Sequence, residues 1–493
     1  MTVISGEEYL NRINQMNAEV WIDGKQMKGN ISDHPAFSGV MKSQAKLYDL
    51  QQKKMDAMTY TSPKTGEKIG LSFLEPKTKE DLEKRRIMIQ EWARNSVGML
   101  GRSPDYMNTA VMSFAAAADI FAVEDNRFAE NMRNLYERAK NKDLSFTHTF
   151  INPQVNRSST YLENSAKVIS AQTIQKNNDG IVVEGARLLA TQGGITDEII
   201  VFPTHLASVN KDFAYAFSIP SNTPGLKFIC RESFRYKDSA FDHPLGSQFD
   251  EIDTIVVFDH VTVPWDRVFC YQNPEASLKI YSESSFYPLI AHQITSRRIV
   301  KTEFILGVAQ MLVNTINVGE YQHIHEKITE VISGLETLKA LLLTSEMNAK
   351  LDKWGTMVPD YPPLYTAISM YSHLYPRYCE ILQQIGASGL VSIPSEMDFL
   401  SDVRSDLETY LQAANTNAND RVKLFRLAWD ISMSAFGSRQ SLYERFFFGD
   451  PVKMASSIYQ NYDKEQSISL VETFLKNNCE NASLFSKTQE EDS

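Results

Sequence analysis

The sequence has few cysteines, and none is arranged as a disulfide framework or a metal site requires. The four are Cys230, Cys270, Cys379 and Cys479, with no CxxC pair and no zinc-type spacing to histidine. Small secreted domains carry many cysteines, and zinc sites pair their ligands at short intervals. We therefore expect free thiols in a reducing compartment and no bound metal.

The common nucleotide-binding and hydrolase motifs are also missing. The chain contains no GxxxxGK[ST] phosphate loop, no GxGxxG after a strand, no HExxH and no GxSxG. Each of these motifs places particular groups around a phosphate, a metal or a nucleophile. The sequence therefore gives no sign of binding NAD(P)H or ATP in the usual folds.

Long apolar runs and basic runs are absent as well. The longest apolar run, Met112–Val123, includes Asp119, whereas a membrane span needs roughly 20 apolar residues. Acidic residues outnumber basic ones by 61 to 50, and the first residues, MTVISGEEYL, are acidic where a signal peptide is basic. A nucleic-acid-binding protein usually has a basic face. We expect a cytoplasmic protein that binds neither nucleic acid nor membrane.

The residue patterns that are present change twice along the chain. Residues 1–150 show helical periodicity, and a capping-box pattern begins at Thr78. Residues 151–280 contain short β-branched and aromatic runs separated by turns, which is typical of a β-barrel or sandwich. Residues 281–493 return to helical spacing. The patterns predict an α+β protein with a helical domain, a β domain and a helical bundle.

One short stretch, Leu144–Arg157, concentrates many polar functional groups. His148 lies between Thr147 and Thr149, and Asn152-Pro153 breaks any regular element. We interpret the stretch as an extended strand that enters an ordered loop. Such a loop offers an imidazole, amides and a guanidinium to a flat heterocycle such as a flavin. The alternative is a polar loop that satisfies its own backbone.

Two further segments carry possible binding groups. The turn from Arg102 to Tyr106 presents a cation and a phenol four residues apart, which suits a small anionic or phenolic ligand. Its alternative is a helix-end turn whose arginine caps carbonyl groups. The late segment that includes Phe448–Pro451 could hold a ring or a pyrophosphate, or could simply end the bundle.

Taken together, five ordered motifs resemble one family. They are GRSPDY, THTFINPQVNRS, GARLLATQGGITDE, SDLETYLQ and GSRQSLYERFFFGDP. Their order and spacing, from about Gly6 to about Lys476, resemble the oxygenase component of 4-hydroxyphenylacetate 3-hydroxylase. The resemblance implies an acyl-CoA dehydrogenase-like fold with a central β-barrel, assembled as a homotetramer. It also implies reduced FAD, supplied by a separate NAD(P)H-dependent flavin reductase, and O2.

The resemblance also implies roles for individual residues. Arg102, Tyr106 and His148 are expected to be catalytic. The substrate site is expected to comprise Arg102, Ser103, Pro104, Asp105, Tyr106, His148, Thr204 and His205. The flavin site is expected to comprise His148, Thr149, Phe150, Gln154, Val155, Asn156, Arg157, Thr191, Phe448, Gly449, Asp450 and Pro451.

The implied reaction is ortho-hydroxylation of a phenol, with 4-hydroxyphenylacetate giving 3,4-dihydroxyphenylacetate. A flavin C4a-hydroperoxide would supply the electrophilic oxygen. Arg102 and His148 would stabilise the phenolate, His148 would accept the proton, and Tyr106 would hold the phenolic oxygen by a hydrogen bond.

Several alternatives remain open at this stage. The substrate could be another phenol, or the chain could be an acyl-CoA dehydrogenase- or dehydratase-like flavoenzyme. The related 4-hydroxybutyryl-CoA dehydratase needs cysteines and a histidine for an iron–sulfur cluster. His292 could match that histidine, but no cysteine lies near it or near Arg102 in the sequence. An inactive flavin-binding protein would leave Arg102, Tyr106 and His148 unexplained.

Overall fold

A computed structural model of the chain describes residues 2–123, 125–154, 168–204, 210–235 and 239–490, with side chains described up to residue 477. It forms two compact units, Met1–Arg445 and Phe446–Ser493. The three segments predicted from the sequence, 1–150, 151–280 and most of 281–493, lie within the first unit. Their boundaries as separate domains stay a prediction.

The N-terminal segment is mostly helical, as the sequence predicts. Its helices are α1 (Gly6–Met16), α2 (Pro35–Lys53), α3 (Met55–Met58), α4 (Lys79–Asn95), α5 (Pro104–Ala116) and α6 (Asn126–Lys142), with 3-10 turns η1 (Ile31–Asp33), η2 (Leu71–Phe73) and η3 (Ala118–Val123). Thr78 begins α4 with a capping box, in which its side chain and that of Asp81 accept each other's backbone N–H groups. The alanine-rich helix α5 is buried on nearly every face.

The central segment forms two sheets, which three short strands from residues 1–150 extend. The strands are β1 (Glu19–Ile22), β2 (Lys25–Gln26), β3 (Thr59–Thr61), β4 (Lys68–Gly70), β5 (Phe146–Thr149), β6 (Gln172–Lys176), β7 (Gly180–Thr191), β8 (Glu198–Val201), β9 (Tyr215–Pro220), β10 (Leu226–Cys230), β11 (Asp253–Pro264) and β12 (Val268–Tyr271). One sheet has the order β2-β1-β10-β11-β7-β6 and the other β12-β9-β8-β5, while β3 and β4 pair by themselves.

The predicted central β-barrel is wrong for the part of the chain that the structure describes. A barrel closes only when every strand has two neighbours, but β2 and β6 end one sheet and β12 and β5 end the other. The sheets meet near the end of β5, where Ile151 bridges Leu188 of β7. Short strands separated by turns are common to barrels and sandwiches, so the sequence pattern alone did not distinguish them.

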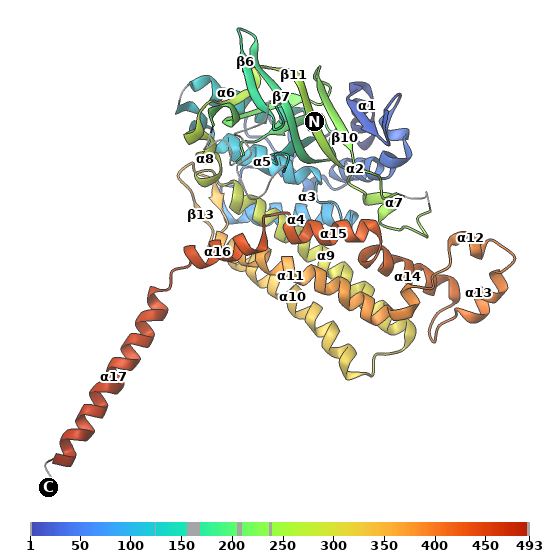
Figure 1. Cartoon of the computed structure of the whole chain (residues 1–493), viewed down its shortest axis with the longest axis vertical. Helices are drawn as coiled ribbons and strands as arrows, with labels where there is room; N and C mark the ends of the chain where they lie inside the picture. The colour runs from blue at the N-terminus through green and yellow to red at the C-terminus, as the bar shows by residue number, and fades with distance from the viewer. Residues whose placement is uncertain (1, 124, 155–167, 205–209, 236–238, 491–493) are drawn as a thin grey trace. The chain divides into compact units, whose positions relative to one another are not determined.

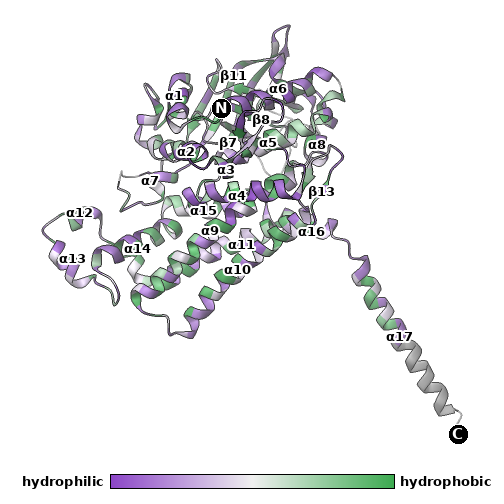
Figure 2. Ribbon diagram, turned by 180° about the vertical axis from the view of Figure 1, so that it is seen from behind, coloured by the Kyte–Doolittle hydropathy of each residue, from purple (hydrophilic) through white to green (hydrophobic). Residues whose placement is uncertain are grey.

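The C-terminal segment is a helical bundle, as predicted. Its helices are α7 (Gly246–Phe249), α8 (Pro274–Ser282), α9 (Phe286–Ile316), α10 (Gln322–Met347), α11 (Tyr361–Gly386), α12 (Glu396–Phe399), α13 (Arg404–Tyr410), α14 (Ala418–Ser432) and α15 (Ala435–Phe446), with the short pair β13 (Lys350–Leu351) and β14 (Met357–Val358). Within the unit Met1–Arg445, Figure 1 shows the strands β6, β7, β10 and β11 at one end and the helices α9, α10 and α11 at the other. Figure 2 shows hydrophobic residues along these three helices.

Helix α9 runs through the centre of the bundle and contacts α4, α5, α10, α11 and α14. By length and composition it is the one helix in the described part that could cross a membrane, and half of its most apolar window is buried. The same helix carries Arg297, Arg298 and Lys301, all buried. All three form ion pairs with Glu444 of α15, at 2.8–3.0 Å.

The second unit begins at Phe446 and contains α16 (Pro451–Asn461) and α17 (Glu465–Glu490). Asp450 caps α16, because its Oδ1 accepts the backbone N–H of Val452 at 2.8 Å. Pro451 is the first helical residue, a position that lacks an intrahelical partner for N–H in any case.

Candidate functional site

The turn Gly101–Tyr106 leads directly into α5, with Pro104 as its first residue. Gly101 has no room for a side chain, since an added Cβ would lie 2.4 Å from the Tyr443 hydroxyl oxygen. The turn therefore packs closely against α15. Arg102 and Tyr106 are both buried there and contact each other.

The Arg102 side chain lies between two tyrosines. Its guanidinium carbon is 4.5 Å from the centroid of the Tyr106 ring, and Nη1 donates to the Tyr443 hydroxyl at 3.0 Å. Burial raises the pKa of Tyr106 to about 12, although Arg102 acts in the opposite direction. Tyr106 therefore keeps its phenolic proton at neutral pH and can donate a hydrogen bond.

His148 lies on β5, and the parallel pairing of β5 with β8 sets its position. Its ring centroid is 5.7 Å from that of Tyr106, 5.6 Å from that of Phe150 and 5.9 Å from that of Phe202. Burial, and then the charge of Arg102, hold its pKa well below the usual value. The imidazole is therefore neutral at pH 7, and its buried Nδ1 has no hydrogen-bond partner among the described residues.

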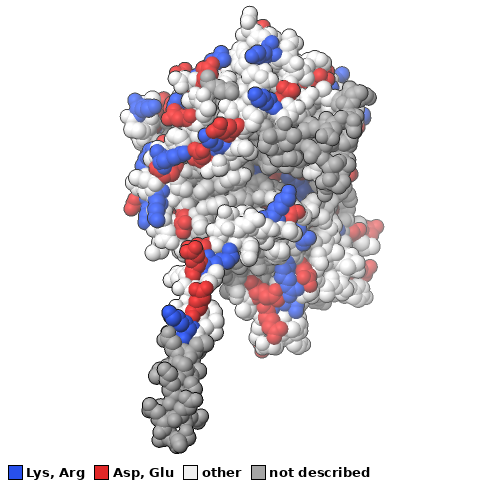
Figure 3. Space-filling view, turned by 60° about the vertical axis from the view of Figure 1, so that its left-hand side comes forward, with Lys and Arg blue, Asp and Glu red and all other residues white. Residues whose placement is uncertain are grey.

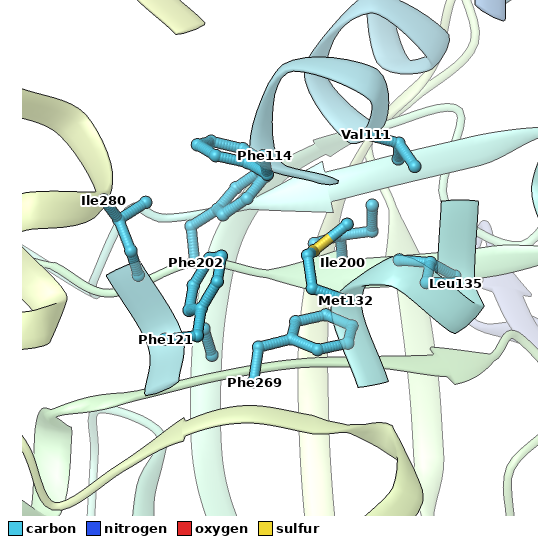
Figure 4. Close-up of a pocket in the computed structure, with 10 residues that line it drawn as sticks. Val111, Phe114, Phe121, Met132, Leu135, Ile200, Phe202, Phe269 and Ile280 are labelled. Atoms are coloured by element: carbon cyan, nitrogen blue, oxygen red, sulfur yellow. The ribbon is translucent and has the colours of Figure 1, made fainter. Parts of the chain in front are cut away.

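Phe202 separates His148 from an apolar part of the core. Its ring packs against Phe114 at 5.3 Å, and Phe114 stacks on Phe286 at 4.9 Å. Phe202 also lines a cavity of ≈ 10 Å³, whose other lining residues are all apolar and come from α5, η3, α6, β8, β9, β12 and α8 (Figure 4). A water molecule there would have no polar partner, so this wall of the site stays dry.

The described residues of the expected flavin site lie beside His148. Phe150 stacks on the imidazole at an interplanar angle of 15° and is 41% exposed. The hydroxyl of Thr149 donates to the Leu188 carbonyl oxygen at 2.8 Å, and that of Thr191 donates to Asp253 at 2.8 Å. Both hydroxyls can therefore only accept a hydrogen bond from a bound group.

These features fit a planar group that has both apolar and polar edges. An exposed aromatic ring, an imidazole nitrogen with no partner among the described residues and two hydroxyl acceptors lie on or next to β5 and β7, two strands that side-chain hydrogen bonds link. Gln154 is exposed at the end of the same segment. Val155, Asn156 and Arg157 lie outside the described residues, so their predicted contacts with the flavin stay predictions.

Thr204 is buried, and a chain of hydrogen bonds anchors it. Asn152 donates to its Oγ1 at 3.0 Å. Arg187 in turn donates to Asn152 Oδ1 and, at 2.7 Å, to the hydroxyl of Tyr215. His205, which the sequence also placed in the substrate site, lies outside the described residues.

The other predicted substrate residues hold the turn together. Asp105 accepts a hydrogen bond from Ser103 at 2.5 Å and another from Gln293 of α9 at 2.8 Å. Both its oxygens are therefore engaged within the protein. Ser103, Pro104 and Asp105 stay predictions as substrate contacts, but the structure shows that Ser103 and Asp105 stabilise the start of α5.

The predicted flavin contacts at Phe448, Gly449, Asp450 and Pro451 belong to the second unit. Gly449 has φ +132°, a conformation that favours glycine, and Asp450 caps α16. The expectation that these residues contact the flavin stays a prediction.

His292, the possible cluster ligand, has a different environment. Its Nε2 lies 2.8 Å from Glu346 of α10, which also pairs with Arg86. No group of three or more histidine, cysteine or acidic side chains suited to a metal ion occurs within the described residues. His292 therefore belongs to a hydrogen-bond network between helices, in which Arg86 and Glu346 form the ion pair.

Sequence reasoning missed the residues that surround the Arg102 peptide group. Glu251 accepts hydrogen bonds from the backbone N–H groups of Gly101 and Arg102, at 2.7 and 2.6 Å. Gln44 and Gln192 donate to the Arg102 carbonyl oxygen at 2.9 and 3.3 Å. The only available signal was an acidic residue beside a strand, which is too common to single out Glu251.

Comparison with known proteins identifies the family of the chain. The family models for the N-terminal and C-terminal parts of 4-hydroxyphenylacetate 3-hydroxylase match residues 5–270 and 278–476. A probable 4-hydroxyphenylacetate 3-monooxygenase of Bacillus subtilis is 54% identical, over 96% of this chain and 99% of its own length. The oxygenase component from Thermus thermophilus is 43% identical over 96% and 97%.

Comparison with solved structures identifies the same family. The oxygenase component of 4-hydroxyphenylacetate 3-monooxygenase in complex with FAD and 4-hydroxyphenylacetate has a TM-score of 0.92 at 42% identity, over 97% of this chain and 99% of that one. An archaeal 4-hydroxybutyryl-CoA dehydratase has a TM-score of 0.86 at 19% identity, over 97% and 95%, which shows a shared fold alone. The chain belongs to the 4-hydroxyphenylacetate 3-hydroxylase family.

Proposed function

We propose that this chain is the oxygenase component of a two-component monooxygenase that converts 4-hydroxyphenylacetate to 3,4-dihydroxyphenylacetate. One oxygen atom of O2 enters the ring ortho to the hydroxyl, the other leaves as water, and reduced FAD supplies the two electrons. The observation that carries the proposal is the packing of Arg102, Tyr106 and a neutral His148 around one buried position.

The residues of the chain support each requirement of this reaction. A phenol reacts with an electrophilic oxygen when its own oxygen carries negative charge, which the Arg102 guanidinium would stabilise. The neutral His148 imidazole can accept the phenolic proton. The Tyr106 hydroxyl can donate to the same oxygen, and the apolar wall around Phe202 keeps water away.

Reduced FAD, once bound, supplies the reactive oxygen together with O2. Phe150, Thr149 and Thr191 would hold one side of its ring system, with the exposed Gln154 further along the same segment. Contacts from Val155, Asn156 and Arg157 are expected from the family resemblance. A separate NAD(P)H-dependent reductase would reduce the flavin, because relatives are named as oxygenase components.

The direct test combines the purified chain, 4-hydroxyphenylacetate, FAD, NADH and any flavin reductase under air. We expect 3,4-dihydroxyphenylacetate by liquid chromatography, and no NADH oxidation when the reductase is left out. The protein should be nearly colourless as purified. A tightly bound oxidised flavin that NADH reduces directly would contradict the two-component assignment.

We further propose a cytoplasmic homotetramer that binds neither nucleic acid nor membrane. Apolar side chains stay exposed on α9 and α10, including Met311 at 57% and Met347 at 73%, and such residues suit contacts between subunits. On the face in Figure 3, Lys and Arg are interspersed with Asp and Glu. That distribution differs from the basic face that nucleic acids require.

A further inference from the structure

The peptide group of Arg102 is held more firmly than its position in a turn requires. Glu251, which is 1% exposed, lies just before β11. Its Oε2 accepts the Gly101 N–H at 2.7 Å, and its Oε1 accepts the Arg102 N–H at 2.6 Å. A single buried carboxylate therefore binds two successive backbone amides, from a residue about 150 positions away.

The carbonyl side of the same residue is held by two amides. Gln44 of α2 donates to the Arg102 carbonyl oxygen at 2.9 Å. Gln192, at the end of β7, donates to that oxygen at 3.3 Å and to Glu251 Oε1 at 3.0 Å. Side chains from three distant segments thus fix both polar groups of one residue.

The proposal rests on the function proposed above. We propose that Glu251 is a positioning residue, which sets the distance between the Arg102 guanidinium and the oxygen of a bound phenol. Glu251 needs no contact with the substrate for this role. It acts through the backbone of Gly101 and Arg102, while Tyr443 and Tyr106 hold the far end of the arginine.

Only a carboxylate can bind this set of donors. Three N–H groups approach the two Glu251 oxygens, so a glutamine of the same shape would direct its own NH2 group at one of them. Glu251→Gln would therefore leave a buried backbone N–H unpaired and displace the turn. Glu251→Asp keeps two acceptor oxygens but is one methylene shorter.

The position of the guanidinium controls how easily the phenol ionises. At an effective dielectric constant of about 20, withdrawing a charge from about 3 Å to about 4 Å weakens its attraction by roughly a factor of ten in an equilibrium constant. The bound phenol would then ionise about one pH unit higher. This change can be measured without turnover.

The test uses 4-hydroxy-3-nitrophenylacetate, a phenol whose anion absorbs visible light. Its ionisation midpoint is titrated in the full chain, with and without reduced FAD under anaerobic conditions. We expect wild type to lower the midpoint below that of the free probe. Arg102→Ala should abolish this lowering. Glu251→Asp keeps the negative charge but displaces the turn, so it should raise the midpoint by up to about one unit. Glu251→Gln should raise it less, because loss of the carboxylate charge, which also faces Arg439 at 3.9 Å, by itself favours the phenolate.

Glu346→Gln is the matched control. Glu346 is also buried and accepts three hydrogen bonds, but its partners are Arg86 and His292. We expect Glu346→Gln to lose stability while its probe midpoint equals that of wild type. This control shows whether destabilisation alone shifts the midpoint.

The following results would contradict the proposal. A wild-type midpoint in a folded Glu251→Asp protein rules out the positioning role. If that variant does not fold, a midpoint in Glu251→Gln below that of wild type leads to the same conclusion, because only the lost charge would then be acting. Failure of the wild-type chain to bind the probe or to lower its midpoint rejects the proposed function itself, and the role of Glu251 with it.

Discussion

Replacing His148 separates a chemical role from a packing role. His148→Ala removes the imidazole and its contacts with the rings of Tyr106, Phe150 and Phe202. His148→Phe removes the nitrogen atoms but keeps a ring at the same place. The pair of variants therefore tests the two roles independently.

The two variants are expected to differ in stability. Each aromatic contact contributes about 0.5–1.5 kcal/mol beyond its buried area, so three contacts predict a loss of about 1.5–4.5 kcal/mol for His148→Ala. His148→Phe should lose much less. Thermal unfolding followed by circular dichroism measures this difference.

The two variants are expected to share the chemical defect. Removing an acid–base group typically costs 10²–10⁴-fold, or about 3–5 kcal/mol of transition-state stabilisation. O2 and reduced flavin should still be consumed, with H2O2 released in place of the dihydroxy product. Stopped-flow absorbance follows flavin oxidation, and a peroxide assay with product chromatography measures how much of the consumed O2 gives H2O2 and how much gives the dihydroxy product.

The pH dependence gives an independent check. Burial and Arg102 hold the pKa of His148 well below 6.5 in the folded chain. A lowered folded-state pKa means that its contribution to stability is present above pH 6.5 and is lost as the pH falls. In His148→Phe, the part of the stability loss below pH 6.5 that comes from protonation of this residue should be absent. Near wild-type coupled hydroxylation by a folded His148→Phe protein would refute the catalytic role.

Two single positions and the subunit assembly give three further predictions. In Gly101→Ala the new Cβ would lie 2.4 Å from the Tyr443 hydroxyl oxygen, so we expect about tenfold weaker binding of the nitrophenol probe, while Gly307→Ala, with nothing within 4 Å, should bind it normally. Burial raises the pKa of Asp143 to about 6 from 3.8, so stability should fall by up to about 3 kcal/mol as the pH rises from 4 to 7. Asp143→Asn should remove that dependence in urea unfolding, and an unchanged slope would contradict the assignment. Light scattering should give four times the 56.0 kDa chain mass, and a monomer at micromolar concentration would count against the tetramer.

Local signals predicted the elements that depend on neighbouring residues. The capping box at Thr78 begins α4, and the β-branched runs become β7 and β11. Strand β1 was not predicted, because it is short and its partner β10 is about 200 residues away. The barrel was predicted wrongly for a similar reason, since closure depends on which edges pair.

For the site too, features local in the sequence were predicted, and contacts between distant residues were not. The spacing of Arg102 and Tyr106 within one turn was visible in the sequence, as was the polar density around His148. That the two segments meet followed only from the family resemblance, and the structure now shows the ring contact between Tyr106 and His148. Glu251 and Tyr443 were not predicted, because a residue that positions another acts through a distant contact.

The buried cations of α9 have a consequence for synthesis of the chain. Arg297, Arg298 and Lys301 leave the ribosome more than 140 residues before Glu444, their shared counter-ion. An unpaired charge is costly to bury, so α9 cannot complete its packing until α15 has been made. A nascent chain halted before residue 444 should therefore keep this central helix accessible to proteases and chaperones.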